Sequence, residues 1–208
     1  MLDPKVPPAG ASPEPALAQP ALRALLAAYA RGWFPMAGAD GAIGLYEADP
    51  RGVLPIQGFR IPRSVARALR RSPFEVTVDR DFDGVVAACA DRTEGTWLSP
   101  ELAAAYAGLH RLGAVHTVEC RRAGRLVGGL FGVAVGGLFT SESMFHRVPD
   151  AGSGALVATA AILARERFVL WDVQELSPHL ARFGGREIPA AEYRARLREA
   201  LGVERRFA

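Results

Sequence analysis

The chain has 208 residues, of which 50% are hydrophobic, 8% aromatic and 23% charged, a composition that excludes a disordered chain, a collagen and a coiled coil. Its two cysteines, Cys89 and Cys120, have neither metal-ligand spacing nor the number that a disulfide framework needs, so we expect a reduced, cytoplasmic protein. No apolar run is long enough to cross a membrane and the N-terminus lacks an apolar signal core, so neither membrane insertion nor secretion is expected.

The net charge of +3 is unevenly distributed along the chain. Residues 51–74 contain six arginines and no acidic residue, so the rest of the chain is net negative. A basic segment on an otherwise acidic protein predicts one surface that binds a polyanion.

The N-terminal part predicts a tail followed by a small domain. Residues 1–19 are rich in proline and alanine, which favours a flexible tail. Pro20 begins an apolar pattern with helical spacing that continues to Tyr29, and Gly32 is suited to end that helix. With the loops and short strands expected up to residue 49, residues 20–50 form the small N-terminal domain.

The basic segment predicts a helix over residues 62–71. Its arginines recur at helical spacing and therefore share one face: Arg63, Arg67, Arg70 and Arg71. Guanidinium groups on one face cannot neutralise one another, so this helix is the expected binding site of the polyanion.

The elements after this helix follow strand and helix patterns. In chain order they are a strand over 74–78, a helix over 82–90, a helix that begins at Ser99, an antiparallel meander over 115–145, a helix over 155–165, a strand over 168–173 and a helix over 189–201. Together they predict an α+β fold, in which the small domain precedes a larger one, residues 51–208, with a central and mostly antiparallel sheet and a late β-α-β unit.

The sequence points to few chemical groups. It contains no phosphate-binding loop, dinucleotide fingerprint or metalloprotease motif, and its histidines lack metal-ligand spacing, so no cofactor or metal is expected. Polar residues instead interrupt apolar strands at Glu142, Asp172 and Gln174. The last two are two residues apart, so their side chains share a strand face and together could hold a ligand amine or hydroxyl; the alternative is an ordinary strand-end turn. Trp97, in a loop before a helix, is either a hydrophobic plug or a platform for a nucleic-acid base.

Several sequence motifs of the chain occur together, and in the same order, in one protein family. The chain resembles the leucyl/phenylalanyl-tRNA–protein transferases over nearly everything after the tail. The matching motifs lie at residues 29–35, 49–51, 94–97, 105–106, 109–110, 116–119, 126–134, 142–145 and 172–174. The most specific of them are the Val-Gly-Gly strand at residues 127–129 and the Glu-Ser-Met-Phe sequence at residues 142–145.

The resemblance implies a larger domain with the fold of the GNAT acyltransferases, but with aminoacyl-tRNA as the acyl donor. The family moves Leu, Phe or Met from tRNA to an N-terminal Arg or Lys of a protein, which marks that protein for degradation. The implied partners are therefore aminoacyl-tRNA and acceptor proteins, without a membrane partner, and a monomer is the favoured state.

The resemblance also assigns roles to individual residues. The arginines of the basic helix match positions that hold the tRNA acceptor stem, and Trp97 matches a tryptophan that stacks near the terminal adenosine. The substrate pocket is expected to include Phe139, Glu142, Leu130 and Leu163. Asp172 and Gln174 match the pair at the reaction centre, where Asp172 would orient the acceptor amine and help to remove its proton, directly or through the terminal ribose, and Gln174 would hold the donor carbonyl or the acceptor.

The chain departs from the family's pattern at several positions. Met36 stands where a tryptophan often follows Phe-Pro, Ser141 replaces a glycine, and Thr159 and Leu163 stand at aromatic positions of the amino-acid pocket. Two alternatives follow. One is a diverged acyltransferase of the same fold that uses another donor, and the other is a non-catalytic protein that binds tRNA or protein N-termini.

Overall fold

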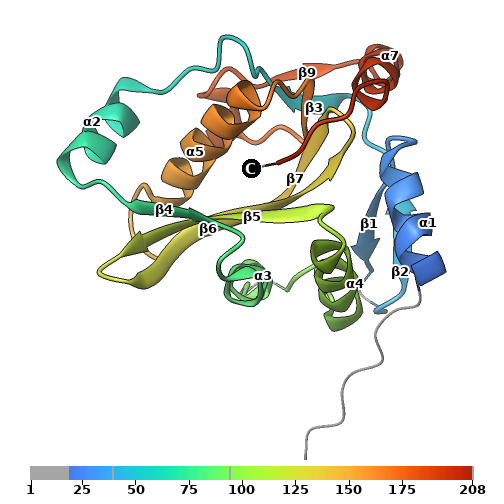
Figure 1. Ribbon diagram of the computed structural model, residues 1–208, viewed down its shortest axis with the longest axis horizontal. Helices are drawn as coiled ribbons and strands as arrows, with labels where there is room; N and C mark the ends of the chain where they lie inside the picture. Colours follow the sequence, from blue (N-terminus) through green and yellow to red (C-terminus); the bar gives the residue numbers. More distant parts are fainter. Residues whose placement is uncertain (1–18, 39, 94, 208) are drawn as a thin grey trace, which may run out of the picture.

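The computed structural model describes residues 19–38, 40–93 and 95–207 (Figure 1). Its centre is a seven-stranded sheet with the strand order β4-β5-β6-β7-β8-β3-β9. The strands are β3 (Arg51–Leu54), β4 (Glu75–Val78), β5 (Val115–Arg122), β6 (Arg125–Val135), β7 (Leu138–His146), β8 (Leu170–Gln174) and β9 (Arg186–Ile188). Only β7 and β8 are parallel among these neighbours, so the mostly antiparallel sheet that the sequence predicts is present.

Helices cover both faces of this sheet. α5 (Ala151–Arg165) connects β7 to β8 and packs on one face, whereas α3 (Phe82–Ala90) and α4 (Pro100–Arg111) pack on the other (Figure 1). α5 approaches the sheet closely, because a Cβ added to Gly128 of β6 would lie only 2.5 Å from the Cβ of Ala151. The glycine on β6 therefore allows the first turn of α5 to lie against the sheet.

The remaining helices lie toward the ends of the molecule. α2 (Arg63–Arg71) and α7 (Ala190–Leu201) lie at opposite ends (Figure 1), and the short α6 (Pro178–Ala181) precedes β9. α2 buries Val65 against the core and exposes its arginines.

The N-terminal residues form α1 (Gln19–Tyr29) and a two-stranded sheet of β1 (Phe34–Ala37) and β2 (Ile43–Tyr46), which is separate from the central sheet. Leu22, Tyr29 and Phe34 belong to the same hydrophobic cluster as buried residues of α3 and α4. The N-terminal part therefore shares a core with the larger part of the chain.

Most predicted elements agree with the structure, with one clear difference at α5. The helices expected over 62–71, 82–90 and 189–201 correspond to α2, α3 and α7. α5 begins at Ala151, whereas the sequence predicts a start at residue 155 because glycines with poor helix propensity occupy the first turn. A Cβ at Gly154 would lie 3.1 Å from the Cys120 sulfur, so packing favours glycine there. The expected tail lies outside the described residues except for Gln19.

Candidate active site

The parallel strands β7 and β8 pair only over part of their length, and the candidate site lies where they part. Their pairing runs from Leu138 opposite Leu170 to Thr140 opposite Asp172. Beyond this point β7 carries Glu142, and β8 ends at Gln174. Side chains from both strands can therefore face the same space between them.

A β-bulge sets the position of Glu142. β6 pairs Phe131 with Ser143 and then Gly132 with Ser141, which leaves Glu142 as the extra residue on β7. The Glu142 carboxylate accepts hydrogen bonds from Tyr106 Oη at 3.0 Å and from Gln174 Nε2 at 3.3 Å. The hydroxyls of Tyr106 and Tyr29 are 2.8 Å apart, so this hydrogen-bond network reaches from β7 through α4 to α1.

Burial dominates the electrostatics of Glu142. Desolvation raises the pKa of its carboxyl to about 8, against the opposing effect of the hydrogen bonds from Tyr106 and Tyr29. The neighbouring charge of Asp172 raises this pKa further, and that of Arg51 lowers it. A carboxyl that titrates near pH 8 can both accept and release a proton at physiological pH.

Asp172 is fully buried and held on all sides. Arg51 donates to both of its oxygens, to Oδ1 at 2.8 Å and to Oδ2 at 2.6 Å. Tyr193 and Thr140 also donate to Oδ2, at 2.9 and 3.2 Å, and the backbone N–H of Gln174 donates to Oδ1 at 2.9 Å. A buried carboxylate with this many donors is a fixed anchor for the strands around it.

This anchor joins distant parts of the chain. Arg51 lies on β3, next to β8 in the sheet, and its Nη1 also donates to the carbonyl of Gly32 at 2.8 Å. Its guanidinium lies 4.9 Å from the ring centre of Phe34 and 4.5 Å from that of Tyr193. The N-terminal segment, β3, β8 and α7 therefore meet at one ion pair.

Gln174 has a backbone conformation that needs such an anchor. Its φ angle of 55° lies in the left-handed region, which is uncommon for a residue other than glycine. The hydrogen bond from its N–H to Asp172 holds this conformation, while its side-chain amide reaches Glu142. Asp172 thus fixes the backbone of Gln174, and Gln174 in turn contacts Glu142.

Two cavities meet at the Glu142–Gln174 pair. A large cavity of about 530 Å³ has Val65, Leu130, Met144 and Leu156 among its apolar lining. A small cavity of about 210 Å³ is lined by Phe34, Pro35, Met36 and Trp97. Three residues line both cavities and so form a shared wall: Glu142, Val173 and Gln174.

The structure brings some of the predicted site residues together and separates others. Leu130 lines the large cavity, Trp97 the small one, and Glu142 and Gln174 both.

Three predicted residues lie away from both cavities. Asp172, Phe139 and Leu163 are fully buried and belong to neither lining. Phe139 stacks on Phe207, with ring centres 4.6 Å apart, and meets Phe168 edge-on. Phe139 and Leu163 are therefore core residues, whereas the Asp172 carboxylate is connected to the shared wall by its hydrogen bond from the Gln174 N–H.

The sequence did not single out the residues that hold Glu142 and Asp172. Tyr29 and Tyr106 are 77 positions apart, and Arg51 and Asp172 are 121 positions apart. Arg51 belongs both to the basic segment and to the family motif at residues 49–51, and the structure shows that it is 1% exposed and that its charge is neutralised within the core. The Asp-Pro-Arg motif is the local signal that distinguishes it from the surface arginines.

Neither a metal centre nor a membrane span is found in the described part of the chain. Residues 19–38, 40–93 and 95–207 contain no group of three or more His, Cys, Asp or Glu side chains that could hold a metal ion. Among the helices of these same residues, none is long and apolar enough to cross a membrane.

Two adjoining cavities that share one wall can hold the two parts of one substrate, with the bond between these parts at that wall. Models of two known domains match the chain. The leucyl/phenylalanyl-tRNA protein transferase domain matches residues 53–198, and the N-terminal domain of the same transferase matches residues 22–49.

Curated proteins named leucyl/phenylalanyl-tRNA–protein transferase match over nearly the whole chain. The protein of Rubrobacter xylanophilus is 51% identical over 88% of this chain and 96% of its own length. Those of Paracoccus denitrificans and Phenylobacterium zucineum are each 48% identical, over 88% and 89% of this chain and 87% and 86% of their own lengths. The chain therefore belongs to the leucyl/phenylalanyl-tRNA–protein transferase family, which confirms the resemblance found in the sequence.

Proposed function

We propose that this protein transfers an amino acid, Leu, Phe or Met, from aminoacyl-tRNA to an N-terminal Arg or Lys of an acceptor protein, which marks the acceptor for degradation. The family of the chain supports this activity, and the larger domain is proposed to have the GNAT acyltransferase fold. The observation that carries the proposal is the Glu142–Gln174 pair on the wall between two cavities. Because aminoacyl-tRNA is a cytoplasmic substrate, the proposal implies a cytoplasmic enzyme.

The two cavities differ in ways that suit the two parts of the donor. The apolar lining of the large cavity, with Leu130 and Leu156, suits a leucyl, phenylalanyl or methionyl side chain. The small cavity offers the indole of Trp97 and the ring of Phe34 to a purine base. With the amino acid in the first cavity and the terminal adenosine in the second, the ester that joins them lies at the shared wall.

The reaction at this wall is aminolysis of an ester. The acceptor nitrogen attacks the ester carbonyl, a C–N bond forms, the C–O bond to the ribose breaks, and the ribose oxygen leaves as a hydroxyl after it gains a proton. Glu142 is the proposed acceptor of the proton that the amine loses, and it then gives this proton to the leaving ribose oxygen, so that the carboxylate is restored. Its pKa of about 8 is matched to that of an α-amino group, about 7.7–8.0, so the proton transfer is nearly balanced.

Gln174 is the proposed hydrogen-bond donor to the donor carbonyl. Its amide faces the shared wall, and a fixed donor aimed at a developing oxyanion stabilises the transition state. Asp172 lines neither cavity and is here a positioning residue, which acts through the backbone of Gln174. This role differs from the one that the resemblance implies, in which Asp172 helps to remove the amine proton directly or through the terminal ribose.

The basic helix α2 is the proposed tRNA contact. Arg63, Arg67, Arg70 and Arg71 are exposed on it. Ser64 and Val65 of the same helix line the large cavity, and Ser64 Oγ accepts a hydrogen bond from Arg182 at 3.3 Å. A tRNA held along α2 would therefore lie beside the large cavity.

A transfer assay with defined substrates tests the activity. The protein is mixed with separately charged leucyl-, phenylalanyl- or methionyl-tRNA and a peptide that begins with Arg, Lys or Ala, and the peptide is then weighed by mass spectrometry. A mass gain of one residue on the Arg or Lys peptide, and none on the Ala peptide, is expected. No gain from any pair while tRNA is still bound would instead indicate a binding protein.

Variants of the two proposed donor contacts locate that activity on the structure. Reversal of Arg67 and Arg70 to Glu is expected to weaken tRNA binding and to flatten its salt dependence. Trp97→Ala is expected to raise the KM for aminoacyl-tRNA about 10-fold, since a base–aromatic stack contributes about 1–3 kcal/mol. Unchanged affinity of the double reversal over a salt series would remove α2 from the proposed tRNA contact.

A further inference from the structure

The hairpin formed by β5 and β6 projects past its neighbours in the sheet. The two strands pair as far as Arg122 opposite Arg125. β4 follows β5 only to Arg121, and β7 follows β6 only to Gly128. The turn consists of Ala123 and Gly124, both with positive φ. Figure 1 shows this hairpin at the same end of the molecule as α2.

The tip of this hairpin is strongly basic. Arg121, Arg122 and Arg125 flank its turn, and no acidic residue occurs between residues 120 and 141. Arg121 pairs with Asp81 at 2.8 Å, which neutralises its charge. Arg122 and Arg125 are exposed, and within the described part of the chain no ion pair engages either of them. Two guanidinium groups of the tip therefore remain available to an outside partner.

The hairpin tip is joined to α2 by direct packing. The Arg122 guanidinium lies 4.6 Å from the ring centre of Phe74, the residue that follows α2 after two intervening positions. Arg71 of α2 and Arg122 line the same depression, of about 360 Å³. Asp150 is the acidic residue of that lining and offsets part of the charge. The stack on Phe74 holds the Arg122 guanidinium in place beside that of Arg71, which reduces the entropy lost when an anion binds.

We propose that Arg122 and Arg125 continue the basic face of α2 and contact the phosphate backbone of the same tRNA. The inference rests on the proposed function and adds a second tRNA contact to it. α2 alone is nine residues long, about 13 Å, and so can follow only a short part of a nucleic acid. The hairpin tip extends the positive surface beyond the end of α2, where the backbone of a bound RNA would continue. Arginines without acidic partners suit phosphates, which accept two parallel hydrogen bonds from a guanidinium.

Salt-dependent binding of tRNA tests this surface. The probe is deacylated leucine tRNA, titrated from about 50 to 400 mM KCl against the wild-type protein and the double variant Arg122→Ala/Arg125→Ala. Each lost phosphate contact lowers the slope of log K against log salt by about 0.9. We expect the slope of the double variant to be less steep by about 1–2, with a Kd raised about 10-fold at the lowest salt. Arg122→Lys/Arg125→Lys keeps the charges and should retain most of the wild-type slope.

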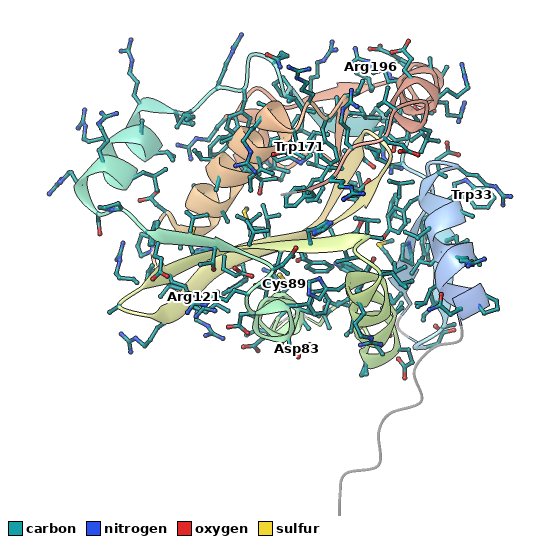
Figure 2. The ribbon with its side chains drawn as sticks, viewed as in Figure 1. Trp33, Asp83, Cys89, Arg121, Trp171 and Arg196 are labelled. Atoms are coloured by element: carbon teal, nitrogen blue, oxygen red, sulfur yellow. The ribbon has the colours of Figure 1, made fainter. Side chains whose placement is uncertain are left out.

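A matched control removes the same charge elsewhere. Arg196→Ala/Arg198→Ala changes two arginines of α7, and Figure 2 shows Arg196 at the opposite end of the molecule from Arg121. This control should keep the wild-type slope and Kd. If it weakens binding as much as the hairpin variant does, the effect is one of net charge and the inference is overturned.

The remaining outcomes separate the inference from the proposed function. If the slope of log K against log salt is unchanged in the hairpin variant, the inference is overturned. This holds even if the Kd rises, because the loss of a phosphate contact must change the salt dependence. A raised KM for an acidic acceptor protein, with tRNA binding unaltered, overturns it in favour of a protein-binding surface. If the wild-type protein binds no tRNA, the proposed function itself fails. Transfer from leucyl-adenosine, a donor without the tRNA body, should be equal in the wild type and in the hairpin variant.

Discussion

Two carboxylic acids on neighbouring strands of this protein lie in opposite kinds of surroundings. Asp172 on β8 is surrounded by donors, among them a guanidinium that contacts both of its oxygens, and it contacts neither cavity. Glu142 on β7 has two hydroxyls and an amide nearby, and it borders both cavities. Asp172 is fully buried and Glu142 is partly buried, and only Asp172 has a cation in direct contact.

This difference indicates a structural role for Asp172 and a chemical role for Glu142. A buried carboxylate that is fully paired with arginine stays charged and holds its surroundings in place. A buried carboxyl without such a partner has a raised pKa, and a group with a raised pKa can move protons. The two neighbouring acids therefore have different roles, because different groups face them.

The largest expected effect is on Asp172. Asp172→Asn removes the negative charge and leaves Arg51 buried without an anion, which should lower the free energy of unfolding by about 3–5 kcal/mol. Transfer should be lost at the same time, because Gln174 loses its anchor. Urea unfolding and the peptide transfer assay measure the two effects. Asp83→Asn, at an exposed position on α3 that Figure 2 labels, should change neither. A fully stable and active Asp172→Asn protein would contradict the anchoring role.

The next effect concerns Glu142. Glu142→Gln keeps the shape and removes the proton acceptor, so kcat should fall about 10²- to 10⁴-fold while tRNA affinity is retained. Glu175→Gln is the matched control, since Glu175 lines the small cavity but is exposed and makes no contact with Tyr106. Loss of the tRNA affinity together with kcat would assign Glu142 to binding rather than to proton transfer.

The raised pKa of Glu142 predicts the direction in which stability and transfer rate change with pH. Since this pKa lies near 8 in the folded protein and at 4.5 for a free carboxyl, the folded state holds more protons between these values. Stability from this group is therefore lost as pH rises from about 4.5 to 8. The transfer rate should rise over the same upper range, because the carboxylate is the active form. Both pH dependences should disappear in Glu142→Gln.

A smaller effect is expected when one donor to Asp172 is removed. Tyr193→Phe deletes a 2.9 Å hydrogen bond to a charged acceptor but leaves Arg51 in place. The free energy of unfolding should fall by about 1.5–3 kcal/mol, and transfer should persist at reduced rate. Chemical denaturation followed by fluorescence measures the change. A loss of unfolding free energy as large as that of Asp172→Asn would mean that the Tyr193 hydroxyl, rather than the ion pair with Arg51, holds Asp172 in place.

The smallest effect is expected at Tyr106. Tyr106→Phe removes a hydrogen bond that lowers the pKa of Glu142, so this pKa should rise and the limb on which the rate increases with pH should move to higher pH, by less than about one pH unit. At pH 7 the rate should fall only a few-fold, and it should recover at higher pH. A rate loss that is the same at every pH would indicate a packing defect instead.

Local patterns in the sequence were sufficient for the elements but not for the partners of the acids. The arginine spacing of α2 and the Ser-Pro start of α4 depend on residues within one or two helical turns, and both agree with the structure. Glu142 and Gln174 stood out because polar residues within apolar strands are few. The bulge that sets the position of Glu142 depends on the pairing with β6, and the burial of Asp172 depends on Arg51, so neither could be predicted from the strand itself.

Phe139 illustrates a second reason why local sequence could not predict the whole site. The family resemblance implies that Phe139 is a pocket residue, but its ring lies in an aromatic cluster with Phe168 and Phe207. Phe207 is the last described residue of the chain, and no local pattern indicates that it folds back on β7. Which side chains line a cavity is decided by such returning segments as much as by the strand that carries the motif.

The ion pair between Arg51 and Asp172 has a consequence for when the protein can act. One partner is made early in synthesis and the other 121 residues later, after α5. A growing chain that has not yet reached β8 has neither the anchor nor Gln174. Transfer is therefore expected only after β8 has been made and has paired with β3.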